Sequence, residues 1–136
     1  MVDTNVLISA ALSAQGLPNR VVAYVVERGQ LLCSDATLHE LDTRLKRPKF
    51  ERYLSAERRE RYVAFIQDHS EPVTVETVVT DSPDPDDNPF LALALDGKAD
   101  YIVSGDKKHL LPLHPYRGIP VLSPREFARE VGIEQG

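Results

Sequence analysis

The chain has 136 residues, of which 42% are hydrophobic and 27% charged, and its formal net charge is −5. This length and composition predict a single domain over residues 1–136 with its own hydrophobic core. No apolar run approaches the roughly 20 residues of a membrane helix, and no secretory signal precedes Asp3, so we expect a cytoplasmic protein without a membrane segment. Cys33 is the only cysteine, which excludes an internal disulfide and a multi-cysteine zinc site.

The first half of the chain predicts the end of a strand, three helices and a second strand. Val2 is predicted to end the first strand, and helices are predicted at residues 5–13 and 18–28, separated by a Gly-Leu-Pro break. A strand follows at residues 31–34, where Cys33 is expected to be buried. The third helix is indicated by a leucine stripe with i, i+3, i+7 spacing, formed by Leu38, Leu41 and Leu45.

The middle of the chain predicts a long helix, a strand, a loop and a buried helix. Ser55 is predicted to cap the long helix, whose inward-facing residues are Tyr62, Val63, Phe65 and Ile66. Residues 73–79 alternate between apolar and polar and predict a strand. A loop rich in proline and aspartate follows at residues 81–89, and the apolar residues 90–95 predict a helix buried on all sides.

The chain is predicted to end with two short strands and a helix. Residues 101–104 form one strand, and residues 119–122 form another, which Pro120 places at a sheet edge. Ser123 and Glu126 form a capping box with proline at the first helical position. The alternation of strands and helices predicts βαβ units and a mostly parallel sheet in a three-layer α/β/α domain.

Charge is distributed unevenly along the chain. Between Arg44 and Arg61, eight basic residues stand against three glutamates, whereas between Asp68 and Asp100, nine acids stand against one lysine. A basic segment can hold a phosphodiester backbone, and an acidic pocket can hold a metal that helps to cut it. A basic run is equally typical of a solvated helix face, so charge alone leaves nucleic-acid binding open.

Four acids are predicted to lie along one edge of the sheet, because each falls near a strand end or on the helix that follows it. They are Asp3, Glu40, Asp87 and Asp106. Carboxylates gathered there without cationic partners would repel each other, and a hard divalent cation such as Mg²⁺ would hold them together. Asp86 is the alternative to Asp87 as the third of these acids.

Each acid also has a structural explanation when it is taken alone. Asp3 and Asp87 are suited to capping helices, Glu40 flanks the leucine stripe as a surface residue would, and Asp106 occupies a turn. The domain could therefore be an interaction module without catalytic activity. The four histidines show no zinc-site spacing, and the glycine-rich nucleotide-binding motifs are absent. A receiver-like phosphoryl-transfer site is disfavoured, because no second acid stands two residues after Asp3.

Four segments resemble, in order and spacing, the motifs of PIN-domain nucleases, and in particular those of VapC-like toxins of toxin–antitoxin pairs. They are Asp3-Thr4-Asn5-Val6, Thr37-Leu38-His39-Glu40-Leu41, residues 84–94 and residues 99–106. The resemblance covers nearly the whole chain. One departure is that only two residues precede Asp3, whereas the family has a longer first strand, which leaves open whether the start is trimmed.

This resemblance implies a parallel five-stranded sheet and an endoribonuclease that depends on Mg²⁺ or Mn²⁺. It implies a homodimer that a cognate antitoxin holds inactive, although a housekeeping RNA-processing nuclease is an alternative role. The implied metal-binding carboxylates are Asp3, Glu40, Asp87 and Asp106, supported by the polar residues Asn5 and Ser104. From the charge pattern, we expect RNA contacts at Arg44, Arg47 and Arg52.

Overall fold

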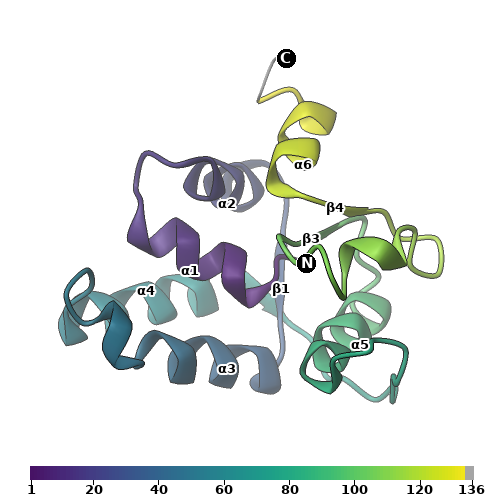
Figure 1. Ribbon diagram of the computed structural model, residues 1–136, viewed down its shortest axis with the longest axis horizontal. Coiled ribbons are helices and arrows are strands. Elements are labelled where there is room, and N and C mark those ends of the chain that lie inside the picture. The colour runs from purple at the N-terminus through teal and green to yellow at the C-terminus, as the bar shows by residue number, and fades with distance from the viewer. Residues whose placement is uncertain (134–136) are drawn as a thin grey trace.

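The computed structural model describes residues 1–133, and Figure 1 shows helices arranged around short pieces of parallel sheet. The α-helices are α1 (Thr4–Leu12), α2 (Leu17–Arg28), α3 (Asp35–Leu45), α4 (Ala56–Asp68), α5 (Asn88–Asp96) and α6 (Pro124–Val131). Three short 3₁₀ turns lie at Pro48–Phe50, Pro85–Asp87 and Leu111–Leu113. The predicted domain extends to residue 136, and its last three residues lie outside the described part.

Side chains that accept hydrogen bonds from the first helical turn determine where four of these helices begin. They are Asp3 for α1, Ser34 for α3, Ser55 for α4 and Ser123 for α6. The capping box predicted at Ser123 is present, and a second one joins Ser34 to Thr37. The predicted helix starts at Ser55 and Ser123 are therefore confirmed, because these side chains satisfy N–H groups that have no partner within the helix.

The strands form two parallel pairs. β1 (Leu31–Cys33) pairs with β2 (Ser70–Pro72), and β3 (Ile102–Val103) pairs with β4 (Val121–Leu122). Val2 forms a parallel bridge to Val103 on the other side of β3, and the Asp3 amide donates to the Val103 carbonyl at 3.0 Å. Val2 thus makes a single-residue bridge where the end of a strand was predicted, and β3 lies between it and β4.

The strand predicted at residues 73–79 is wrong. Its alternating pattern is present, but no strand is assigned there. The Val73 amide donates to the Cys33 carbonyl at 2.8 Å, which extends the contact with β1 by one hydrogen bond. The amides of Glu76 and Thr77 donate instead to the Asp96 carboxylate, at 2.7 and 2.9 Å. A side chain at the end of α5 therefore takes the hydrogen bonds that a neighbouring strand would supply, and the paired strand is β2, immediately upstream.

The mixed α/β class is confirmed, whereas the three-layer arrangement around one five-stranded sheet is not. The described strands have two or three residues each and form two separate two-stranded pairs. The prediction that Phe65 faces inward is also wrong. Its side chain is 42% exposed, and its ring lies 4.3 Å from that of His69 on the outside of α4.

The interior contains the elements that the sequence marked as most apolar. Phe90 to Ala94 of α5 are all buried, as predicted for this helix, and so is Cys33. The amino ends of α1 and α5 and the carboxyl end of β3 face one another beside this core (Figure 1). Within residues 1–133, no helix has both the length and the apolar character needed to cross a bilayer.

Candidate metal centre

Asp3 lies between the Val2 bridge and α1, and both of its carboxylate oxygens accept hydrogen bonds. Oδ1 accepts from the Val6 amide at 3.0 Å, and Oδ2 accepts from the Ser104 hydroxyl. The residue is only 5% exposed. Burial raises the pKa of the Asp3 carboxyl above its usual value, against the opposing effect of these two hydrogen bonds. Asp3 is therefore a helix cap, and the remaining lone pairs of its carboxylate are available to a cation.

Ser104 connects two of the predicted acids. It is fully buried at the end of β3. Its hydroxyl donates to Asp3 and accepts from the Asp106 amide at 3.0 Å. The predicted supporting residue therefore lies between the first and fourth acidic motifs.

Asp106 holds the turn that follows β3. Its Oδ1 accepts from the backbone amides of Lys108 and His109, at 2.9 and 3.0 Å, and its Oδ2 lies 3.3 Å from His109 Nδ1. Burial alone would raise the pKa of Asp106, but these hydrogen bonds and the nearby imidazole outweigh it, so the pKa lies below its usual value. Asp106 is thus a turn aspartate that stays ionised.

Asp84 and Asp87 are joined by the hydroxyl of Ser82 at the entrance to α5. Ser82 Oγ accepts from the Asp84 amide at 3.2 Å and donates to Asp87 Oδ2 at 3.3 Å. Burial, followed by the charges of Asp106 and Asp84, raises the pKa of Asp87 to about 6. Asp86, the alternative third acid, is exposed, and its charge acts on Glu40, whereas Asp87 lies beside Asp84 and His109.

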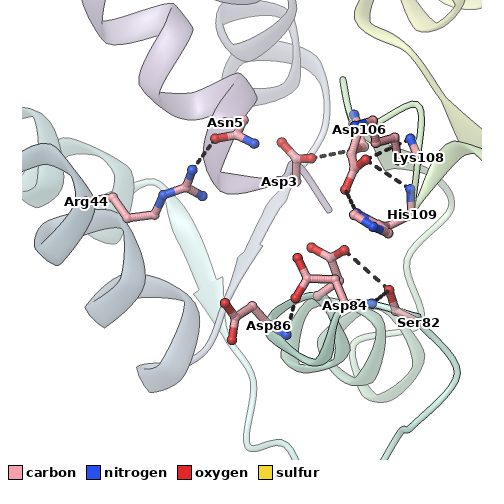
Figure 2. Close-up of polar contacts among 11 residues, drawn as sticks. Asp3, Asn5, Arg44, Ser82, Asp84, Asp86, Asp106, Lys108 and His109 are labelled. Carbon is pink, nitrogen blue, oxygen red and sulfur yellow. Dashed lines mark hydrogen bonds and ion pairs between the residues drawn. The ribbon is translucent and has the colours of Figure 1, made fainter.

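One group of side chains is close enough to hold a metal ion within the described chain. Ligand atoms of Asp84, Asp87 and His109 all lie within 4.8 Å of one another, and the three residues are half-buried. Figure 2 shows Asp84, His109, Asp106 and Asp3 around a common space. The sequence leaves the third ligand ambiguous among Asp84, Asp86 and Asp87 and favours Asp87 alone, and the prediction missed His109. The spacing of His109, three residues after Asp106 in a turn, was the available signal.

Arg44 lies on the α3 side of the same space (Figure 2), and Glu40 precedes it by four residues on the same helix. The Arg44 guanidinium contacts Glu40 Oε1 at 3.4 Å and donates to Asn5 Oδ1. Burial raises the pKa of Glu40, Arg44 lowers it, and the charges of Asp86 and Asp3 raise it. Glu40 and Asn5 thus lie beside the acids but are paired with Arg44.

Two of the predicted acids, Glu40 and Asp106, therefore have a basic side chain beside them. Arg44 and His109 supply positive or polar partners on opposite sides of the site. Arg44, predicted to contact RNA, is already bonded to Glu40 and Asn5. Arg47 and Arg52 are exposed, and RNA contact at these two residues remains a prediction.

Residues 1–108 match the sequence family described as the PIN domain. This chain belongs to the PIN-domain family. An uncharacterized protein of Methanocaldococcus jannaschii, MJ1680, is 28% identical over 141 residues, which cover 96% of this chain and 89% of the archaeal protein. No solved structure matches the chain. PIN domains are typically nucleases and usually bind divalent metals.

The donor set of this PIN domain fits a divalent cation. Its carboxylates are oxygen ligands of the kind that Mg²⁺ and Mn²⁺ accept. Burial, and then the charges of Asp106 and Asp84, raise the pKa of Asp87, so the neighbouring carboxylates disfavour its charged form. A cation among these residues would remove that repulsion. Asp84, Asp87 and His109 are the residues placed to hold it.

Proposed function

We propose that this PIN domain is a metal-dependent endoribonuclease that hydrolyses RNA phosphodiester bonds. The observation that carries the proposal is the group formed by Asp84, Asp87 and His109. Asp106 lies close enough for its charge to raise the pKa of both Asp3 and Asp87. Mg²⁺ or Mn²⁺ held there would supply a Lewis acid for the phosphoryl group and activate water.

The residues of the chain have distinct roles in this proposal. Asp87 and Asp84 bind the cation, and the Ser82 hydroxyl holds the Asp87 carboxylate and the Asp84 backbone amide through its two hydrogen bonds. Asp3 adds negative charge from a buried position fixed by Ser104. Glu40 remains a candidate ligand from α3, where Arg44 limits its movement.

The purified protein is expected to cleave RNA in Mg²⁺ or Mn²⁺ and to be inactive in excess EDTA. The physical reason is that the carboxylates have no means of activating the phosphate without the cation. Cleavage of a labelled single-stranded RNA, measured on a denaturing gel, checks this. Asp84→Asn, purified in the same way, is the control for contaminating nucleases. Equal cleavage with and without EDTA would contradict the proposal.

Replacing Arg47 and Arg52 together by alanine is expected to weaken RNA binding and its dependence on salt. Both side chains are exposed, and removing each arginine that binds a phosphate should reduce the slope of log affinity against log salt by about 1. Binding is measured in EDTA at several salt concentrations. Arg28→Ala, which removes an exposed arginine from α2, is the matched control. An unchanged slope would make Arg47 and Arg52 plain surface residues.

For the biological setting, we propose a toxin of a toxin–antitoxin pair that acts as a homodimer in the cytoplasm. The support is the order of acidic motifs, which resembles that of VapC-like toxins. Growth arrest on expression, relieved by the product of a neighbouring small gene, tests this role, and light scattering tests the dimer. An active nuclease without such arrest would indicate a housekeeping role.

An inactive interaction module is the second candidate, and a specific observation favours it. Asp3 caps α1, and Asp106 closes its own turn, so both acids have structural roles that need no metal. A calorimetric Mn²⁺ titration separates the two candidates, because a module without a metal site should give no binding heat.

A further inference from the structure

His109 occupies a fixed position that is not explained by turn formation alone. Its backbone amide donates to Asp106 Oδ1 at 3.0 Å, and the Lys108 amide donates to the same oxygen. This turn brings the imidazole back toward Asp106, where Nδ1 lies 3.3 Å from Oδ2. The half-buried ring therefore has a defined orientation beside Asp84 and Asp87, as Figure 2 shows for His109, Asp106 and Asp84.

The contact between Asp106 and Nδ1 has a chemical consequence for the second ring nitrogen. A carboxylate that accepts a hydrogen bond from one ring N–H of histidine fixes the tautomer and leaves the other nitrogen able to bind a metal. Such carboxylate–histidine pairs accompany metal-binding histidines in general. Asp106 is then a positioning residue for His109, because its own oxygens are already bonded within the turn.

We propose that His109 contributes a nitrogen ligand to the metal site and makes it select Mn²⁺ over Mg²⁺. The proposal rests on the proposed metal-dependent function. Mg²⁺ prefers oxygen ligands and keeps several waters. Mn²⁺ also suits carboxylates, but as a first-row transition-metal ion it accepts an imidazole nitrogen more readily than Mg²⁺ does. Two carboxylates and one imidazole thus form a donor set that favours Mn²⁺ over Mg²⁺. Carboxylates alone would distinguish the two cations less well.

The competing explanation is that His109 serves only as a counter-ion for the surrounding acids. A counter-ion would move away when the cation arrives and would not contact it. Its removal would then affect Mg²⁺ and Mn²⁺ to the same extent, since both ions carry the same charge. A ligand, in contrast, affects the ion that prefers nitrogen. The two explanations are therefore distinguished by whether removal of His109 changes the Kd for Mn²⁺ more than the Kd for Mg²⁺.

The test is calorimetric titration of Mn²⁺ and of Mg²⁺ into the wild type, His109→Gln and His69→Gln. His69 ends α4 and stacks on Phe65, so it is a histidine control outside the site. For His109→Gln, we expect the Kd for Mn²⁺ to rise by about tenfold or more and that for Mg²⁺ by less than about threefold. Equal changes for both metals, or none, would overturn the proposal.

A spectroscopic measurement tests the same contact, and its first readout, a nitrogen coupling to the metal, needs only the wild type. Pulsed electron paramagnetic resonance of the Mn²⁺-loaded protein should show a nitrogen coupling that responds to isotope labelling of histidine and is absent in His109→Gln. An oxygen-only environment would remove His109 from the metal. Metal binding and RNA cleavage would then still support the nuclease, whereas a wild type that binds neither metal would refute the proposed function itself.

Discussion

Asp87→Asn is expected to abolish metal-dependent RNA cleavage while making the metal-free protein more stable. Asp87 belongs to the group that can hold a metal, so the substitution removes a charged ligand but keeps the shape of the side chain. Loss of even a residue that only supports a ligand costs roughly 10–100-fold. We therefore expect cleavage to fall by at least about 100-fold.

The gain in stability follows from the pKa of Asp87. Its pKa is raised from 3.8 to about 6 by burial and then by Asp106 and Asp84. Between these pH values, the folded state binds more protons than the unfolded state, so stability falls as pH rises from about 4 to about 6 and stays low above that range. Asparagine carries no charge, so the variant lacks this loss at neutral pH.

The size of the gain is limited by two effects. Asp87 is only half-buried, so solvent screening reduces the energy that corresponds to its shifted pKa. Its charge also lies at the amino end of α5, where an acid contributes about 0.3–1 kcal/mol of favourable energy. A net gain on the order of 1 kcal/mol remains, which corresponds to roughly 3–5 °C in Tm for a domain of this size.

Thermal unfolding in EDTA at several pH values measures this effect. The Tm difference between Asp87→Asn and the wild type should be largest near neutral pH and vanish below about pH 4, where Asp87 becomes protonated in both states. Asp86→Asn is the matched control, since Asp86 is exposed in the same turn. Loss of cleavage in Asp86→Asn and its retention in Asp87→Asn would assign the site to Asp86 instead.

Local signals in the sequence predict the helices well because each signal acts within one helical turn. Ser55 and Ser123 cap the helices they were predicted to cap, and the apolar run of α5 is buried. Pairing between distant segments is predicted less well, because it depends on contacts that no local pattern describes. The alternating segment 73–79 lacks a ladder because Asp96, about twenty residues downstream, bonds its amides, and no local pattern contains that competition.

The sequence predicted that several acids lie close together, but it did not predict the partners of each acid. The general rule for α/β folds predicts that Asp3 and Asp106 lie near one another, whereas Asp87 follows no described strand directly and lies at the amino end of α5. Which charges accompany them depends on contacts between residues far apart in the chain. Arg44 reaches Asn5, 39 residues earlier, and His109 enters the group through a turn that Asp106 closes. These partners decide the balance of charge, and they appear only in three dimensions.

Ser104→Ala is expected to destabilise the fold by about 1–3 kcal/mol, the usual cost of leaving a buried polar group without its partner. The Ser104 hydroxyl is fully buried and serves both Asp3 and the Asp106 amide. Alanine removes both hydrogen bonds at once and provides no replacement. No cavity of consequence forms, because a single oxygen is deleted, so the loss reports the polar contacts themselves.

The loss should grow as pH rises, which distinguishes this explanation from simple repacking. The hydrogen bond from Ser104 opposes the effect of burial on the pKa of Asp3, so its removal raises that pKa further. The folded variant then binds a proton over a wider pH range than the folded wild type, and its stability falls more steeply with rising pH. At low pH, where Asp3 is protonated in both proteins, only the loss at the Asp106 amide remains.

Urea unfolding of the wild type, Ser104→Ala and Ser104→Thr, measured at several pH values in EDTA, checks this expectation. Threonine keeps the hydroxyl, so Ser104→Thr should recover the pH dependence of the wild type even if its extra methyl group costs some stability in the core. A loss in Ser104→Ala that is the same at every pH would mean that Asp3 does not depend on Ser104 for its charge. The buried carboxylate would then need another donor, and the link between β3 and the amino end of α1 would be one of packing alone.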